Sequence, residues 1–188
     1  MPHKKILQDL INSATAAKTH YEVYWAQANE AKSSLLDTLN EHVDFFRASY
    51  DAHYVAFFVY LAHLFEKNRD SSCIQTYLSA IALTTDPIQF HDWQVQYKNL
   101  AERALPLIRA RNKTVAHVDA RLSESDVFGP LQITWDDVRM VIYDSAKFVA
   151  ELAGTTELGS IGIPRDGRLI DSTLKMIRTL KEANRKHC

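Results

Sequence analysis

No glycine precedes Gly129 in this 188-residue chain, and all five glycines fall in its last third. Glycine supplies the positive φ angles that tight hairpin turns need, so a long stretch without it favours helices over β-hairpins. Apolar residues recur at helical spacing through most of the same stretch. We therefore predict an all-α, single-domain helical bundle of about six helices.

The spacing of apolar residues also predicts where the helices lie. Asp86 or Thr85 is expected to cap the fourth helix, inside which Pro106 predicts a kink or a restart. Thr134 and Asp137 form a capping box at the start of the fifth. The predicted domain covers 1–188, with a core over 1–155 and a C-terminal loop and helix over 156–188. The six predicted segments are 3–30, a stretch over 35–65 that a kink could interrupt, a short helix ending near Leu83, a helix opening at Pro87, one opening at Thr134, and one over 168–186.

Composition points to an ordinary cytoplasmic protein. Apolar residues make up 46% of the chain and charged residues 24%. The longest apolar run, over 54–62, is far shorter than the roughly 20 residues that cross a bilayer, and the N-terminus has no signal-peptide pattern. Two cysteines far apart in the sequence indicate no disulfide framework. We expect no membrane association.

The net charge of −1 argues against broad nonspecific binding of nucleic acid. The charges are nevertheless segregated, because residues 103–121 and residues 165–188 each carry a balance of +4. A local basic patch is therefore compatible with the near-neutral total. The C-terminal run also fits a solvated helix face, and that alternative stays open.

The segment "RARNKTVAHVDAR", residues 109–121, follows directly on an apolar helical stretch. On an ideal helix, Arg111 falls within about 40° of the stripe that contains Trp93 and Leu100. A guanidinium there needs an acidic partner, a subunit interface or an anionic ligand. His117 lies about 240° further round, so the two side chains cannot meet on one straight helix. Either the helix deforms after Arg111, or a site combines residues from two chains.

Part of this segment, "RNKTVAH", resembles the signature of HEPN domains, which is an arginine, a polar residue and then a histidine. Arg111 is the arginine, Asn112 fills the polar position, and five residues separate Arg111 from His117. The stretch "LAHLFEKNRDSSCIQTYL", followed by a long helix ending in this motif, is similar to the abortive-infection (AbiU-type) branch of that superfamily. The resemblance covers roughly residues 1–155 in helix order.

The resemblance implies a homodimer with the motif at the two-fold interface and, in active members, metal-independent RNA cleavage in phage defence or as a toxin. The implied catalytic residues are Arg111, His117 and Asn112. Histidine titrates near neutrality and can act as acid or base, and a guanidinium can bind the phosphorane with two hydrogen bonds. The expected partners are RNA, a second copy and an inhibitor protein, with no cofactor. Lys113, Arg109 and Asp119 complete the set as substrate-binding candidates.

A second reading gives the same residues no catalytic role. Nuclease-dead HEPN domains serve as interaction or nucleotide- and RNA-binding modules, and this chain could bind a partner through the same groove. Arg111 could instead form a structural ion pair, and His117 could interact with the dipole at a helix C-terminus.

A metal site is not predicted from the sequence. Neither H-E-x-x-H nor C-x-x-C occurs, and both are spacings at which metal ligands commonly share one element. His63 lies in an apolar helix, so we expect it to be a hydrogen-bonded core residue.

Overall fold

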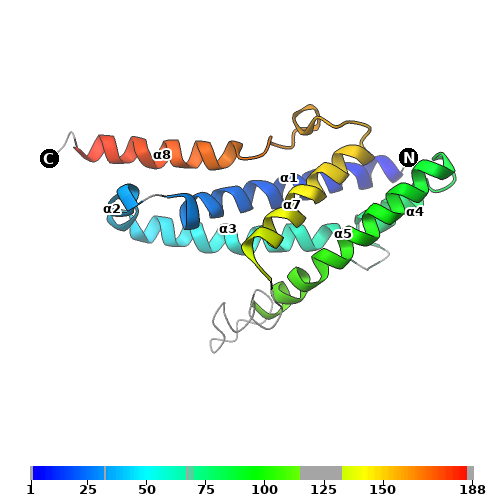
Figure 1. Ribbon diagram of the computed structural model, residues 1–188, viewed down its shortest axis with the longest axis horizontal. Coiled ribbons are helices and arrows are strands. Elements are labelled where there is room, and N and C mark those ends of the chain that lie inside the picture. The colour runs from blue at the N-terminus through cyan, green and yellow to red at the C-terminus, as the bar shows by residue number, and fades with distance from the viewer. Residues whose placement is uncertain (1, 32, 67, 69, 115–132, 186–188) are drawn as a thin grey trace.

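The computed structural model describes residues 2–31, 33–66, 68, 70–114 and 133–185. Within these ranges the chain is helical and contains no strand, which confirms the predicted all-α class. Seven α-helices are described, one more than predicted, because the stretch over 35–65 is divided at His42. They are α1 (Pro2–Trp25), α2 (Ser33–Glu41), α3 (Val43–Leu64), α4 (Ile74–Ile81), α5 (Pro87–Thr114), α7 (Trp135–Leu152) and α8 (Arg168–Arg185), shown in Figure 1.

Helices α1 and α3 form the antiparallel pair at the centre of the molecule (Figure 1), and among the described helices they make the most extensive contact. The apolar stripe of α1 includes Leu10, Ala14 and Tyr21, and it packs on Phe57 and other residues of α3. The predicted first helix, over 3–30, agrees with the extent of the helical stretch, but its last five residues are not α-helical, because α1 ends at Trp25. A π-helical turn, η1 (Ala26–Glu30), follows and leads to α2.

Helices α5 and α7 lie side by side and cross the central pair at an angle (Figure 1). α5 continues through Pro106 as one helix, so the predicted restart does not occur. A proline removes one helical hydrogen bond, and burial of Ala104, Leu107 and Ala110 on both sides of it holds the helix together. Burial of this stripe is also what places the end of α5 against the rest of the bundle.

Helix α8 packs along α1, η1 and α2, away from the α5–α7 layer (Figure 1). It contributes Leu174 and Ile177 to a small hydrophobic cluster with Ala26, Leu35 and Phe46, separate from the main core. A 3-10 turn, η3 (Leu158–Ile161), lies in the connection from α7. None of the helices in the described ranges has the length and apolarity that crossing a bilayer requires.

Candidate functional site

Helix α5 carries the first half of the predicted motif. Its start is fixed as the sequence predicts, because Asp86 accepts hydrogen bonds from the backbone N–H groups of Ile88 (3.0 Å) and Gln89 (3.1 Å). Leu100, Ala104 and Leu107 are buried, and position 111 follows Leu107 by one further turn of the same helix. The backbone therefore keeps the register from which the position of Arg111 is predicted.

The structure places some of the predicted site residues and leaves others outside its described part. Arg109 is exposed in the last two turns of α5. Arg111, Asn112 and Lys113 belong to the final helical turn, and their side chains lie outside the described residues. His117 and Asp119 fall in 115–132, which is also outside that part. The grouping of these side chains thus stays a prediction.

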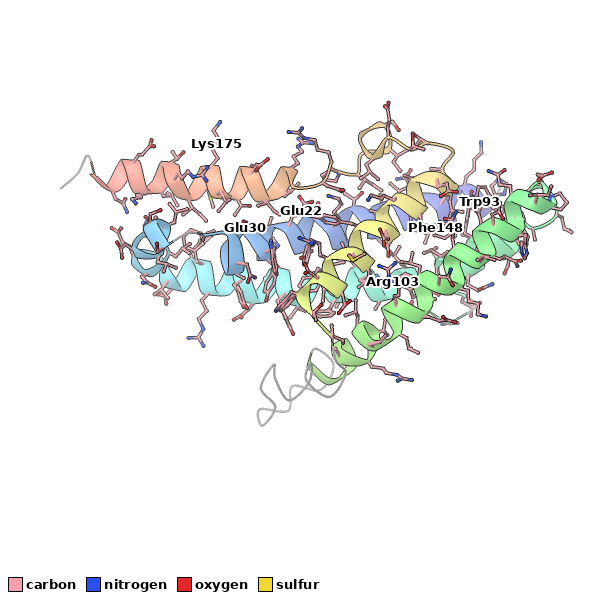
Figure 2. The ribbon with its side chains drawn as sticks, viewed as in Figure 1. Glu22, Glu30, Trp93, Arg103, Phe148 and Lys175 are labelled. Atoms are coloured by element: carbon pink, nitrogen blue, oxygen red, sulfur yellow. The ribbon has the colours of Figure 1, made fainter. Side chains whose placement is uncertain are left out.

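Two polar contacts tie α5 to α7, one at the middle of α5 and one near its start. Arg103 forms a salt bridge with Asp144 at 2.9 Å, and the Trp93 indole donates a hydrogen bond to Glu151 at 3.0 Å. Figure 2 shows Arg103 and Trp93 on the side of α5 that faces α7. Both partners of the salt bridge are partly exposed, so it positions α5 more than it stabilises the fold.

Helix α7 begins with the predicted capping box. The backbone N–H of Asp137 donates to the Thr134 hydroxyl at 3.1 Å, and the backbone N–H of Thr134 donates to the Asp137 carboxylate at 2.9 Å. The Thr134 hydroxyl also donates to this carboxylate at 2.6 Å, and this bond, followed by the one from the Thr134 backbone N–H, lowers the pKa of Asp137. Two orphan N–H groups at the start of α7 are thereby satisfied locally.

An aromatic cluster lies between α1, α3 and the start of α7. The ring of Tyr24 contacts the rings of Tyr50, Phe57 and Trp135, with centroids 4.7, 5.5 and 5.2 Å away, and its hydroxyl lies 3.0 Å from that of Tyr50. Tyr21 and Tyr143 pack nearby, and burial raises the pKa of each phenol. Both phenols are therefore neutral at physiological pH.

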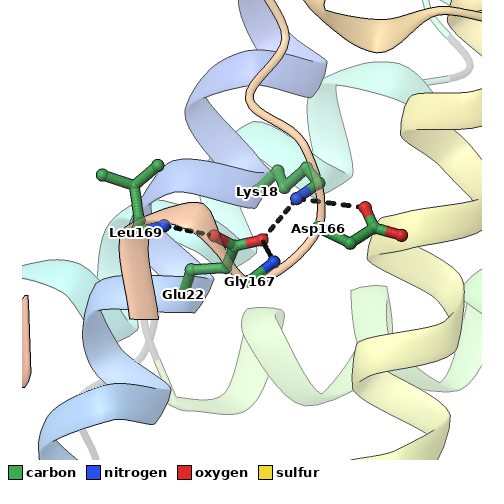
Figure 3. Close-up of polar contacts among 5 residues, drawn as sticks. All are labelled: Lys18, Glu22, Asp166, Gly167 and Leu169. Atoms are coloured by element: carbon green, nitrogen blue, oxygen red, sulfur yellow. Dashed lines mark hydrogen bonds and ion pairs between the residues drawn. The ribbon is translucent and has the colours of Figure 1, made fainter. Parts of the chain in front are cut away.

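The most deeply buried charges form a cluster between α1 and the start of α8 (Figure 3). Lys18 and Glu22 are both 0% exposed and are ion-paired with each other. Lys18 also contacts Asp166 at 3.2 Å, and its ammonium lies 4.5 Å from the centre of the Tyr143 ring. Only the i, i+4 spacing of Lys18 and Glu22 was visible in the sequence.

The carboxylate of Glu22 also serves as a tertiary cap for α8. Gly167 donates its backbone N–H to one oxygen at 3.0 Å, and Leu169 donates to the other at 2.9 Å (Figure 3). Gly167 has a φ of 78°, a left-handed conformation that glycine adopts at little cost. Because each oxygen of the Glu22 carboxylate accepts a hydrogen bond from the start of α8, this cluster anchors α8 to α1.

A pocket of about 690 Å³ lies where α4 meets the first half of α5. Its lining includes Glu66, Cys73, Thr76 and Tyr97; the buried Cys73 thiol lies 3.2 Å from the Thr76 hydroxyl. Tyr97 precedes the end of α5 by about 25 Å of helix. Among the lining residues that the structure describes, one side chain is acidic and none is basic.

Two observations on histidines differ from what the sequence predicts: the exposure of His63, and a contact between His20 and His53 that was not predicted. His63 is exposed, so the prediction that it is a core residue is wrong; its side of α3 faces solvent. His20 of α1 and His53 of α3 instead lie together, with their Nδ1 atoms 2.7 Å apart. In the described part of the chain, no group of three or more His, Cys, Asp or Glu residues is arranged to hold a metal ion.

A family model for AbiU2, a HEPN family, matches residues 2–156. The match includes α1 to α7 and the whole 111–117 segment, and it ends before α8. Neither the curated proteins nor the solved structures contain a significant match to the chain. With most of its length matched by that model, the chain belongs to the AbiU2 family of abortive-infection HEPN domains.

Proposed function

We propose that this protein is a metal-independent endoribonuclease of the HEPN type, acting in phage defence or as a toxin in the cytoplasm. The observation that carries the proposal is the position of the RNKTVAH segment. It lies inside the family match and begins in the last turn of α5, one turn beyond the buried Leu107. An arginine at that place in an apolar register calls for an anionic partner.

Each proposed role follows from the chemistry of RNA cleavage. The ribose 2′-oxygen attacks phosphorus as its proton passes to a base, and the bond to the 5′-oxygen breaks as that oxygen receives a proton. His117 supplies the acid–base step, and Arg111 binds the charge that develops on the phosphorane. Asn112 supports the phosphate. The products carry a 2′,3′-cyclic phosphate and a 5′-hydroxyl.

Substrate binding is assigned to the residues around this centre. Arg109 has an exposed side chain at the end of α5, where it can contact the RNA backbone without a large desolvation cost. Lys113 adds a second positive charge within one turn, and Asp119 orients the imidazole or the RNA. Loss of Arg109 or Lys113 should therefore weaken binding and reduce its salt dependence more than it slows the chemical step.

The proposed active unit is a homodimer. Position 117 lies about 240° from position 111 on a straight helix, so one chain with α5 simply extended would not bring the two side chains together. A two-fold interface between two 111–117 segments supplies an arginine and a histidine from different copies, and it also supplies a second histidine. As a toxin, such an enzyme would need an inhibitor protein in its host.

The test is cleavage of total RNA in excess EDTA by purified wild type, His117→Ala and His91→Ala. His91 is an exposed histidine near the other end of α5 and serves as the matched control. Wild type and His91→Ala should cut the RNA and leave cyclic-phosphate ends, and His117→Ala should lose about 10²–10⁴-fold in rate. Asn112→Ala should have a smaller effect.

Two outcomes would overturn the proposal. Cleavage that needs a metal ion, or that survives His117→Ala, would remove the proposed chemistry. No cleavage by any variant, combined with RNA or protein binding that Arg111→Ala weakens, would favour the non-catalytic interaction module.

A further inference from the structure

His20 and His53 form the closest contact between two titratable side chains of α1 and α3. Their Nδ1 atoms are 2.7 Å apart, and their ring centroids are 4.9 Å apart with the rings tilted by 44°. Both side chains are half-buried, so solvent reaches one side of the pair. No described carboxylate forms an ion pair with either ring, which leaves each imidazole with the other as its polar partner.

The packing around the pair fixes both rings. Tyr60 stacks on His20 with an interplanar angle of 1°. One turn along each helix, Tyr24 and Phe57 lie in the core with their ring centroids 5.5 Å apart. The two histidines therefore project from the most tightly packed helix pair, where their backbones have little freedom to separate.

Two neutral imidazoles at this distance can share one N–H in a hydrogen bond, and the same arrangement suits a metal ion. An ion bound to two imidazoles at 2.0–2.1 Å holds the two nitrogens about 2.9 Å apart when they are cis at a right angle, and about 3.3 Å apart in a tetrahedron. The observed separation is near the first value. Water can complete the coordination from the open side.

We propose that His20 and His53 form a two-histidine site for a divalent ion that favours nitrogen ligands, namely Zn²⁺, Ni²⁺ or Cu²⁺. Imidazole suits these ions, whereas Mg²⁺ and Ca²⁺ require oxygen ligands. When the ion binds, the ring that carried the shared Nδ1 proton changes to its Nε2–H tautomer by exchange with water, so that both Nδ1 lone pairs are free to bind the ion. The ion then joins the last two turns of α1 to the middle of α3. The site is independent of the 111–117 segment, and EDTA would empty it without affecting the proposed cleavage of RNA.

Isothermal titration with each ion, and with Mg²⁺ as the negative control, tests the site. The full chain carries the changes His3→Gln, His187→Gln and Cys188→Ser, because these terminal residues could bind metal by themselves. We expect one Zn²⁺, Ni²⁺ or Cu²⁺ per chain, none of Mg²⁺, and a rise in melting temperature with ion concentration. His20→Gln and His53→Gln should each weaken binding at least about tenfold, because one ligand of a chelating pair is lost.

His63→Gln and His91→Gln are the matched controls. His63 is exposed on α3, the helix that also carries His53, and His91 is exposed on α5. Each should bind as the parent does. Binding that both site variants retain, or no binding at millimolar ion, would overturn the proposal and leave the pair as a hydrogen bond. Should the site variants fail to fold, electron paramagnetic resonance of the Cu²⁺-loaded parent decides: coupling to two imidazole nitrogens is expected, and coupling to fewer overturns the site.

Discussion

Two polar clusters involve residues that lie within five positions of each other on α1, and they differ in burial and in how many partners their polar groups have. Lys18 and Glu22 face α8 and are fully buried, whereas His20, about 160° round the helix from Lys18, faces α3 and is half-exposed. In the first cluster each oxygen of the Glu22 carboxylate has a partner. In the second cluster, the only polar contact described is the one between the Nδ1 atoms of His20 and His53.

The difference shows how burial decides what a polar group can be used for. A buried charge that loses its partner costs several kcal/mol, so the Lys18–Glu22 cluster has no spare capacity for a ligand. Neutral histidines at a half-open position avoid that cost and keep lone pairs available. One cluster therefore anchors the C-terminal helix, and the other can bind something from solution.

The largest expected effect is the loss of the buried carboxylate. Glu22→Ala leaves Lys18 buried with only the partly exposed Asp166 as its counter-charge, and it removes the cap of α8. We expect the free energy of unfolding to fall by about 3–5 kcal/mol in urea titrations. Proteolysis should then cut first near the start of α8.

Glu182→Ala, an exposed acidic residue of α8, is the matched control and should change stability by less than about 0.5 kcal/mol. Lys18→Met combined with Glu22→Gln should cost less than the two single changes added together, because neither then leaves an unpaired charge. Equal effects of Glu22→Ala and Glu182→Ala would contradict the assigned role of the cluster.

A smaller effect should come from acid in metal-free buffer containing EDTA. Burial lowers the pKa of His20, and burial together with the charge of His20 lowers the pKa of His53, both from 6.5. The unfolded chain then binds protons more readily than the folded one, so the free energy of unfolding is highest above pH 6.5 and falls as the pH drops below it. Urea titrations across this range measure the slope.

In the double variant His20→Gln, His53→Gln, the free energy of unfolding should depend less on pH, because the contribution of the two histidines is removed. His63→Gln changes an exposed residue of α3 and should leave the pH dependence as it is in the parent. An unchanged slope in the double variant would show that the pair titrates as it does in the unfolded chain.

The smallest effect compares two ways of capping a helix. Glu22 caps α8 from a distant, buried position, whereas Thr134 caps α7 locally and at the surface. Thr134→Ala should cost about 1 kcal/mol, visible as a lower melting temperature. Thr179→Ala, on the exposed face of α8, should cost less. A loss at Thr134 as large as that at Glu22 would remove the distinction between local and tertiary caps.

The features that the sequence predicted depend on neighbours within one helix. The cap at Asp86, the capping box at Thr134 and the register of α5 all follow from spacings of three or four residues. Burial on both sides of Pro106 overrode its local tendency to break the helix. Local spacing therefore accounts for the helices of α5 and α7 and for the position of Arg111 on its stripe.

The features that it missed join residues that are distant in the chain. His20 and His53 are 33 positions apart, and Glu22 meets Gly167 across 145 positions. No periodicity encodes such pairs, because they depend on how α1 packs against α3 and α8. His63 was misjudged for the same reason: an apolar run does not say which side of a helix its partners leave open.

Co-expression of differently tagged variants tests most directly whether two copies share Arg111 and His117 in one site. Mixed dimers of Arg111→Ala with His117→Ala keep one arginine and one histidine on different chains, so they should recover part of the RNA cleavage seen in EDTA. Mixed dimers of wild type with the double variant keep both on one chain and should be inactive. The reverse pattern, or a purely monomeric active protein, would contradict the shared site.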